Sequence, residues 1–296
     1  MPSFRSAKSQ AEHAIKKNLR VGIARHTQRH DQKIHSLGTA RNYTQALTRI
    51  TQWIQQNKLG DLKRLTKETA IHYLEARGQL VKQKTLDQER QAIQMHLGMP
   101  LPVIKSELSQ ILKSRAYTMA QVDYIIKAQT PKHRLATQIA YAAGLRAHEL
   151  LTLQCNDKQS ASTHRQWSTL RFTGRAGQVY TVIGKGGLIR EVLIPDALAQ
   201  QLEQHRLAQP FIKLDRTIKY RQHYNIGGGK DWSSSFSAAS KRVLNWSHGA
   251  HGLRHTYAQT RMDELQQHGF LYYAALEVVS QELGHFRSDI TEVYLR

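Results

Sequence analysis

Apolar residues recur in the first third of the chain at the spacing of amphipathic helices. Four of them follow a four-three-four spacing and form one helical face: Tyr43, Leu47, Ile50 and Ile54. A second helix is expected over residues 69–80. A third opens at Thr85, where Gln88 three residues later completes a capping-box pattern. These helices predict a small helical domain over residues 37–97.

A glycine and two prolines interrupt this helical pattern, and we interpret residues 98–116 as a linker. A second capping box, Thr118 with Gln121, then opens a further helix. The helix after it carries apolar residues every three to four positions and ends at Gly144. These signals begin the second predicted domain, which extends over residues 117–296.

In the middle of this second domain the periodicity changes to that of strands. Two β-branched segments, residues 179–183 and 189–194, flank Gly184-Lys-Gly-Gly187, which is typical of a hairpin with a glycine-rich turn. Helical patterns then resume to the end of the chain, interrupted by three glycines at 227–229. The predicted fold class is therefore mainly α with a small antiparallel β-sheet.

Charge distinguishes this chain from an average globular protein. It has 43 basic and 22 acidic residues, a formal net charge of +21. Residues 1–115 hold 21 basic and 8 acidic side chains (net +13), and residues 116–296 hold 22 and 14 (net +8). Such a balance favours polyanions, of which DNA and RNA are the commonest. An anionic membrane surface and a merely soluble basic protein are the alternatives.

Residues 1–36 carry eight basic and two acidic side chains with little apolar periodicity. We predict a basic arm there, partly helical, that becomes ordered on DNA. The chain has no run of about 18 apolar residues and no apolar N-terminal signal segment, so we expect neither a spanning helix nor secretion. No single strongly amphipathic basic helix dominates the chain, so a membrane partner is not expected, and the single cysteine suits a cytoplasmic location. Cys155 is the single cysteine, which excludes an internal disulfide and a structural zinc site built on thiolates.

Several polar residues of the second domain have the chemistry for breaking a DNA strand without a metal. The reaction needs a nucleophile for phosphorus, cations for the non-bridging oxygens and an acid for the departing 5′-oxygen. Arg146 suits the cationic role because its planar fork can bind two phosphate oxygens. Glu149, three residues later, is expected on the same helical face, where it would orient Arg146 or a histidine. A surface ion pair is the plainer interpretation of these two residues.

Lys185 occupies the turn of the predicted hairpin. A flexible turn can bring its ammonium group into the DNA minor groove beside the cut phosphate, where it would protonate the leaving oxygen. The plainer interpretation is a turn lysine in solvent. A nucleotide-binding P-loop is excluded, because the Gly-x4-Gly-Lys-Ser/Thr pattern is absent around both Lys185 and Lys230.

His251 and Arg254 are three residues apart, so both can face one phosphate. His251 and His255 are four apart, a spacing that also resembles a metal-binding pair on a helix. The glutamate of the His-Glu-x-x-His motif is absent between them, no obvious third ligand accompanies them, and Arg254 would repel a cation. We therefore do not expect a metal site.

His285 follows a Leu-Gly pair, and this glycine is expected to end a helix and expose the imidazole. The segment after it predicts a short capped helix from which Tyr294 projects, nine residues beyond His285. A phenol attacks phosphorus poorly unless cations stabilise its anion, and the arginines and His285 could do so. Taken alone, Tyr294 reads more plainly as a packed aromatic residue near a chain end.

The order of these pieces resembles the tyrosine recombinase family, which includes phage-type integrases and Xer-like resolvases. The matching stretches are Gly144-Leu-Arg-Ala-His-Glu-Leu-Leu-Thr-Leu153, Gly184-Lys-Gly-Gly187, His251-Gly-Leu-Arg-His-Thr-Tyr-Ala258, and Leu283-Gly-His285 with Tyr294. The resemblance covers about residues 117–296 well, as the catalytic domain. Residues 37–97 are similar to the family's helical core-binding, DNA-binding domain only in size and type.

The resemblance also implies roles for individual residues and no metal or organic cofactor. These roles are phosphate binding for Arg146 and Arg254, protonation of the leaving oxygen for Lys185, proton transfer for His251, transition-state stabilisation for His285, covalent attachment for Tyr294 and a supporting acidic position for Glu149. The function implied is that of an integrase, a site-specific recombinase of a mobile genetic element. It would cleave and rejoin DNA through a 3′-phosphotyrosyl intermediate.

The partners implied are double-stranded DNA recombination sites, with four copies of the chain on two paired sites. Accessory DNA-bending or directionality proteins and a nucleoid-associated location belong to the same expectation. Two alternatives stay open. A type IB topoisomerase shares the chemistry but relaxes DNA as a monomer, and a catalytically inactive DNA-binding regulator would share only the binding.

Two features depart from the family's usual pattern. The chain ends at Arg296, two residues after Tyr294, whereas many members continue with a segment that packs on a neighbouring subunit. That mode of subunit coupling is therefore not expected here. Residues 261–276 form a longer and more polar stretch than usual between two motifs, and the apolar residues after it predict a packed helix that leads to His285.

Overall fold

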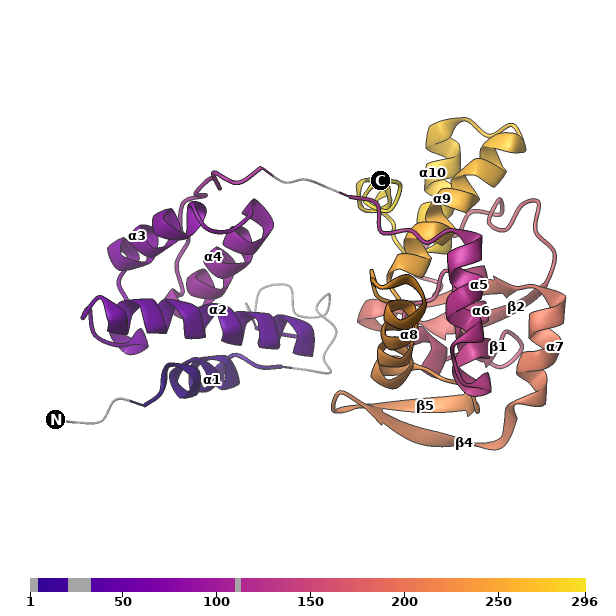
Figure 1. Cartoon of the computed structure of the whole chain (residues 1–296), viewed down its shortest axis with the longest axis horizontal. Helices are drawn as coiled ribbons and strands as arrows, with labels where there is room; N and C mark the ends of the chain where they lie inside the picture. Colours follow the sequence, from indigo (N-terminus) through magenta and orange to yellow (C-terminus); the bar gives the residue numbers. More distant parts are fainter. Residues whose placement is uncertain (1–4, 21–32, 110–112) are drawn as a thin grey trace. The chain divides into compact units, whose positions relative to one another are not determined.

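The computed structural model describes residues 5–20, 33–109 and 113–296. The chain divides into two compact units, Met1–Ile111 and Leu112–Arg296 (Figure 1). The boundary between these units falls inside the predicted linker, and each unit has a hydrophobic core of its own. Among the helices that the structure describes, none combines the length and the apolar character needed to cross a membrane.

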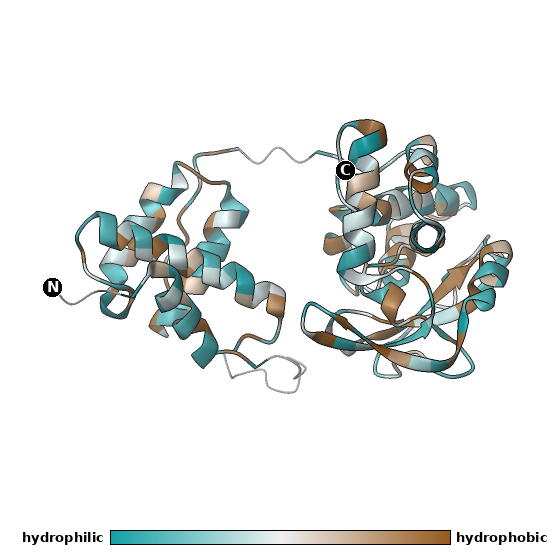
Figure 2. Ribbon diagram, turned by 60° about the horizontal axis from the view of Figure 1, so that its bottom comes forward, coloured by the Kyte–Doolittle hydropathy of each residue, from teal (hydrophilic) through white to brown (hydrophobic). Residues whose placement is uncertain are grey.

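The first unit is helical. Its elements are α1 (Ala7–Lys17), α2 (Leu37–Gln56), the 3-10 turn η2 (Leu62–Arg64), α3 (Lys67–Gly78) and α4 (Gln83–Leu97). The apolar face predicted for α2 is present, because Leu47, Ile50 and Ile54 are buried in the core of this unit. Its helices carry both hydrophilic and hydrophobic residues (Figure 2), as expected for elements with one face in a core.

The start of α4 differs from the prediction. The helix begins at Gln83, two residues before Thr85, and has no side-chain cap of its own. The Gln83 amide instead donates to the carbonyl oxygen of Ile104 (3.0 Å), and its oxygen accepts from the Ser106 N–H (2.8 Å). A tertiary contact with the chain beyond the helix therefore replaces the expected capping box at this end.

The predicted arm over residues 1–36 also differs from the structure. Part of it forms α1, which packs against α2 and contributes three buried side chains to the core of the first unit: Ala11, Ala14 and Ile15. The Gln10 side chain also accepts a hydrogen bond from the Leu62 N–H (3.0 Å). This helix belongs to the folded unit and not to a separate arm, whereas residues 21–32 lie outside the described part of the chain.

The second unit combines helices with two small antiparallel sheets. Its helices are α5 (Met119–Lys127), α6 (Pro131–Ala143), α7 (Asp196–Gln204), α8 (Gly229–Leu244), α9 (Gly252–Gln267), α10 (Tyr272–Glu282) and α11 (Ser288–Glu292), with 3-10 turns η3 (Glu149–Leu151) and η4 (Lys185–Gly187). The first sheet has the order β1-β2-β3, with β1 (Gln154–Cys155), β2 (Gln178–Ile183) and β3 (Ile189–Ile194). The mainly α fold class with a small antiparallel sheet is confirmed.

The local signals of this unit match its elements. Thr118 and Gln121 form the predicted capping box of α5, and Pro131 is the first residue of α6. The predicted hairpin is present, with β2 and β3 paired from Gln178↔Ile194 to Ile183↔Ile189.

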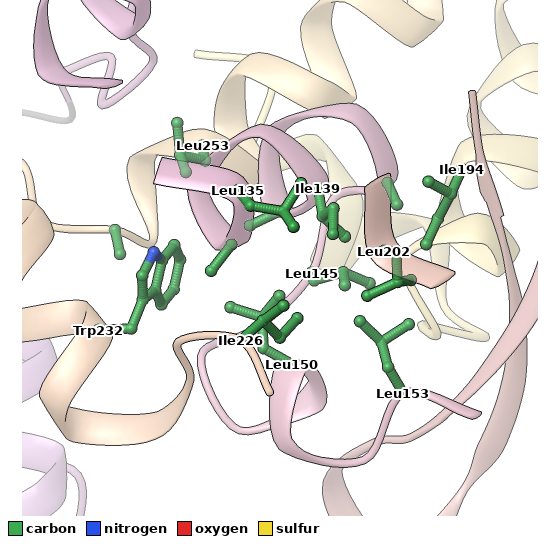
Figure 3. Close-up of a cluster of buried hydrophobic side chains, with 14 of the residues drawn as sticks. Leu135, Ile139, Leu145, Leu150, Leu153, Ile194, Leu202, Ile226, Trp232 and Leu253 are labelled. Carbon is green, nitrogen blue, oxygen red and sulfur yellow. The ribbon is translucent and has the colours of Figure 1, made fainter. Parts of the chain in front are cut away.

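Of two hydrophobic clusters in the described residues of this unit, the larger joins its helices to the first sheet (Figure 3), and the second packs α9 against α10. Leu135 and Ile139 of α6 lie in the larger cluster with Leu253 of α9 and Trp232 of α8. The indole N–H of the fully buried Trp232 donates to the Thr137 hydroxyl (2.9 Å), so its one polar atom is satisfied. The core therefore fixes α6 and the start of α9, which flank the polar residues described below.

A second hairpin, β4 (Arg206–Asp215) with β5 (Ile218–Tyr224), replaces the helix predicted between α7 and the three glycines. Its turn residues, Arg216 and Thr217, have φ of 49° and 70°, a conformation usually supplied by Asn-Gly or Asp-Gly. The absence of that turn chemistry, and Pro210 within a strand, explain why the sequence pattern did not predict it.

Candidate active site

Arg146 and Glu149 lie in the turn that follows α6. Gly144 ends the helix with φ of 59°, and a Cβ there would lie 2.8 Å from the Tyr257 ring, so only glycine fits. The Arg146 N–H donates to Glu149 Oε2 (2.8 Å), and its guanidinium donates to Oε1 (2.6 Å). The predicted pairing of Arg146 with Glu149 is present, but in a turn ahead of η3 and not along the face of a helix.

Glu149 is a fully buried carboxylate that is shared by three arginines. Besides Arg146 it accepts a hydrogen bond from Arg190 Nη2 (2.8 Å), and Arg254 Nη1 lies 3.8 Å from Oε2. Burial by itself would raise the pKa of Glu149, but the three guanidinium groups outweigh it and hold this pKa far below its usual range. The carboxylate is therefore ionised and keeps the arginines close together.

Arg190 was not predicted as a site residue. It is fully buried in β3, where it also donates to the Glu282 carbonyl oxygen (2.5 Å). The sequence contains a signal for it, because Arg190 alternates with the buried Val192 and Ile194 on the core face of a strand. An arginine at such a position needs a buried anion, which Glu149 supplies.

Arg254, in the first turn of α9, is also fully buried. It donates to the carbonyl oxygens of Gly144 and Leu283, the latter at 2.9 Å, and its Nη2 lies 3.4 Å from His285 Nε2. Burial and the neighbouring Arg146 lower the pKa of this guanidinium from its ordinary value. An anion beside the two guanidinium groups would offset their charge, so the chemistry of this cluster suits a phosphate.

His285 follows Gly284, which has φ of 71° and lies so close to Arg190 that a Cβ would stand 2.9 Å from the arginine Cδ. The helix end was predicted correctly, but the imidazole is buried, with 8% exposed, and not open to solvent. Its Nε2 lies 3.1 Å from Arg146 Nη2 and its Nδ1 3.1 Å from the Thr291 hydroxyl. Because a guanidinium only donates, Nε2 must accept and the ring is neutral.

The electrostatics of His285 agree with this tautomer. Burial, Arg254 and Arg146 together lower its pKa to about 3. A phosphate bound beside the two arginines would offset their charge and raise this pKa. His285 is therefore suited to donate a hydrogen bond to an anion once that anion is bound.

Tyr294 lies two residues after the end of α11, and its N–H donates to the Thr291 carbonyl oxygen (2.8 Å). It does not project from the helix, as the sequence suggested, but is buried with 8% exposed. The Gln259 amide donates to the carbonyl oxygens of Tyr294 and Arg296, both at 3.0 Å. These contacts fix the last residues of the chain against α9.

The Tyr294 ring lies among three histidines and a guanidinium. Its centroid is 5.4 Å from that of His251, 4.6 Å from His255 and 5.3 Å from His285, and the Arg254 carbon Cζ is 5.8 Å away. His255, considered earlier only as a metal ligand, thus packs closest to the phenol. Within the part of the chain that the structure describes, no group of three or more His, Cys, Asp or Glu residues could hold a metal ion.

His251 forms the N-cap position of α9; part of the residue is exposed, while its ring packs against His255 and Tyr294. The partial burial of its ring, with Arg254 and His255, lowers its pKa to about 4. The imidazole is therefore neutral near pH 7 and able to accept a proton.

Lys185 lies exposed in the η4 turn between β2 and β3, as predicted. The structure does not bring it into the arginine cluster. The turn nevertheless begins beside that cluster, because a Cβ at Gly184 would lie 3.3 Å from Glu149 Oε1 and 3.8 Å from Arg146 Nη1. Gly186 and Gly187 have φ of 78° and 81°, so the turn has the backbone freedom to change its shape.

No family model matches the chain, and no curated protein sequence does. Among solved structures, the chain is similar to XerH site-specific recombinase in a post-cleavage complex with its palindromic difH substrate, with a TM-score of 0.59. The sequence identity is 15%, over 98% of this chain and 81% of that chain.

A lambda integrase dimer bound to a COC′ core site is similar too, with a TM-score of 0.57 and 14% identity. That match covers 97% of this chain and 76% of the other. Both matches extend over nearly the whole of this chain, at identities too low to carry individual residues across. The fold inferred from the ordered motifs is confirmed, and the chain has the fold of the tyrosine recombinases.

Proposed function

We propose that this chain is a site-specific DNA recombinase of the tyrosine recombinase family, which cleaves and rejoins DNA strands through a 3′-phosphotyrosyl intermediate. One observation carries the proposal: the centroid of the Tyr294 ring lies 4.6–5.4 Å from the centroids of three imidazole rings and 5.8 Å from Cζ of the buried Arg254. This arrangement supports the proposal, because the imidazoles could transfer protons and the guanidinium could bind a phosphate beside Tyr294 as nucleophile.

In the proposed cleavage step the Tyr294 oxygen attacks the scissile phosphorus. A new P–O bond to tyrosine forms, and the bond between phosphorus and the 5′-oxygen breaks. His251 takes the phenol proton, and Lys185 gives a proton to the departing 5′-oxygen. One phosphate ester replaces another, so a new 5′-hydroxyl can reverse the step without an external source of energy.

Arg146, Arg254 and His285 would hold the non-bridging oxygens of the phosphate during this step. The Arg146 side chain is 20% exposed, so it can reach an incoming phosphate directly, whereas the buried Arg254 stabilises charge from beneath. Glu149 would keep the guanidinium groups oriented, since they would repel one another without it.

We also propose double-stranded DNA sites as the substrate and a homotetramer on two paired sites as the working assembly. The solved XerH structures hold difH DNA, and lambda integrase has been seen as a dimer on a core site and as a tetramer on a Holliday junction. The net charge of +21 supports a DNA partner. Accessory DNA-bending or directionality proteins and a cytoplasmic, nucleoid-associated location belong to this proposal.

The proposal is tested by replacing the nucleophile. On a nicked suicide substrate, Tyr294→Phe should abolish the covalent protein–DNA adduct on denaturing gels and leave DNA binding nearly unchanged, because only the hydroxyl is removed. EDTA should leave cleavage by the unaltered protein unaffected. Cleavage retained by Tyr294→Phe would defeat the assignment, and a strict need for a divalent ion would indicate a nuclease.

Two other functions remain as outcomes of further assays. A type IB topoisomerase would relax a plasmid that carries no paired sites, whereas a recombinase needs two sites. An inactive DNA-binding regulator would bind DNA and form no adduct at all.

A further inference from the structure

The connection between β1 and β2, residues 156–177, is long for two adjacent antiparallel strands. Its Ser162 is anchored to β3, because the Ser162 N–H donates to the Ile189 carbonyl oxygen and the Ile189 N–H donates to the Ser162 hydroxyl, both at 3.0 Å. We call residues 162–173 the β1–β2 loop. Its other contacts lead away from the sheet and toward the residues that flank His285.

The loop holds the residue that follows His285. The Trp167 ring meets the Phe286 ring edge-on with centroids 4.9 Å apart, and the Arg165 guanidinium carbon lies 4.8 Å from the Phe286 centroid. Trp167 is itself fixed, since its indole N–H donates to the Ser162 carbonyl oxygen (3.0 Å) and Arg171 packs on its face at 4.6 Å. Phe286 therefore lies against a rigid aromatic side chain and not only against solvent.

The loop also holds the residues before Gly284. The Ser168 N–H donates to Gln281 Oε1 (2.6 Å), and the Phe172 N–H donates to Glu282 Oε1 (2.7 Å). Gln281 and Glu282 are buried at the end of α10. Two backbone donors of the loop thus bind consecutive side chains just ahead of the Gly284 turn.

The same short segment supplies three groups to the candidate active site. The Glu282 carbonyl oxygen accepts from Arg190 (2.5 Å), the Leu283 carbonyl oxygen accepts from Arg254 (2.9 Å), and the His285 imidazole lies beside Arg146. A displacement of this segment would therefore change the position of the arginines and of the histidine together.

We infer that the β1–β2 loop positions the His285 segment for strand cleavage, with Trp167 as its main positioning residue. The inference rests on the proposed function. It follows from where the contacts lie, since they hold the segment on both sides of Gly284 and leave the reacting groups themselves free. Small misplacements of a reacting group have large effects on rate, so support of this kind has a measurable consequence.

The test measures single-turnover formation of the covalent adduct at saturating DNA, on a suicide substrate, together with DNA affinity. Trp167→Ala should slow adduct formation by roughly 10- to 100-fold with unchanged affinity, because the geometry is loosened and the phosphate contacts are not removed. Trp167→Phe, which keeps an aromatic ring against Phe286, should restore most of the rate. Leu170→Ala is the matched control, since Leu170 lies in the same loop with 48% of its surface exposed.

A substrate with a bridging sulfur at the 5′ position separates positioning from proton donation. A thiolate leaves without being protonated, so this substrate rescues the loss of a general acid and not the misplacement of His285. Trp167→Ala should stay slow on it. If Trp167→Ala does not unfold cooperatively, Arg165→Gln replaces it as the test variant. The rate of adduct formation by Arg165→Gln should fall about two- to fivefold, because only one exposed cation–π contact is removed.

The outcomes distinguish this inference from the proposed function. Adducts formed by Trp167→Ala, or by Arg165→Gln where that variant takes its place, at the rate of the unaltered protein would overturn the positioning role and leave the recombinase proposal intact. A defect that appears only as weaker DNA binding would overturn it as well. Absence of any adduct with the unaltered protein would overturn both.

Discussion

At the scale of single residues, Glu149 explains why three arginines can lie together inside the second unit. A buried charge persists only where it is paired and hydrogen-bonded. The carboxylate binds Arg146 and Arg190 and lies near Arg254, two of which are themselves fully buried. The carboxylate thus orients the guanidinium groups within the folded protein, and under the proposed function this arrangement would favour stabilisation of a charged transition state.

Lys185 is the predicted acid, and its role can be separated from phosphate binding. Lys185→Ala should lower cleavage of an ordinary substrate by about 10²- to 10⁴-fold, because the 5′-oxygen would leave without a proton. On a substrate with a bridging 5′-sulfur, the same variant should cleave nearly as fast as the unaltered protein. Arg146→Ala, as the control, should stay slow on both substrates. A Lys185→Ala defect that the sulfur does not relieve would assign another role to the lysine.

His285 should make stability depend on pH. Its pKa is lowered from 6.5 to about 3 in the folded protein, so between these values the unfolded chain binds more protons. The stability contributed by the neutral ring is fully present above 6.5 and is lost as pH falls toward 3. We expect the free energy of unfolding of His285→Gln, measured in urea, to fall less steeply on acidification across this pH range. The difference in slope should correspond to about one proton fewer taken up on unfolding. Equal pH dependence in both proteins would contradict this assignment.

At the scale of elements, two glycine turns join helices to the site. Gly144 joins α6 to the Arg146 turn, and Gly284 joins α10 to His285. These turns were predictable, because a glycine after the last apolar position of a helix is a local signal. The burial of His285 was not, since its ring contacts Arg146 and Arg254, which are 139 and 31 positions away in the chain.

Gly284→Ala should impair both stability and cleavage. An alanine at φ of 71° is strained, with a cost of about 1–3 kcal/mol, and its Cβ would also lie 2.9 Å from Arg190. Gly98→Ala is the matched control, because Gly98 also has φ of 71° but has no atom within 4 Å of the added carbon. We expect Gly98→Ala to be milder in thermal unfolding and to leave adduct formation unchanged. Equal cleavage by the two variants would show that the Gly284 turn does not fix the site.

The two hairpins show when a local sequence pattern is enough to predict an element. The β2–β3 hairpin has two β-branched segments around a glycine-rich turn, and both its strands and its turn were predicted. The β4–β5 hairpin has neither signal, since its turn consists of Arg216 and Thr217 in a conformation that favours glycine or asparagine. Part of its stability comes from tertiary bonds instead, such as that of Asp215 with the Lys230 N–H (2.8 Å).

At the scale of the whole molecule, the basic charge of both units predicts strongly salt-dependent DNA binding. If basic side chains neutralise six or more DNA phosphates, a plot of log K for binding against log salt concentration should have a slope of about −5 or steeper. Fluorescence anisotropy of labelled duplex DNA over a salt series measures this slope. A slope near zero would indicate that the excess charge of +21 does not serve DNA binding.

Residues close in sequence were sufficient to predict most of the helices and the first hairpin, because capping, periodicity and glycine turns act within a few positions. The roles of the candidate site residues came from the order of the motifs and stay predictions. The pairing of Arg146 with Glu149 spans only three residues. The arrangement of the site depended on the folded chain, because its other contacts join residues 41 and 139 positions apart, Arg190 with Glu149 and Arg146 with His285. A buried carboxylate acquires its partners only when the core has brought distant strands and helices together. For this reason the contacts of Arg190 with Glu149, of His255 with Tyr294 and of the β1–β2 loop with the His285 segment were decided by the tertiary structure.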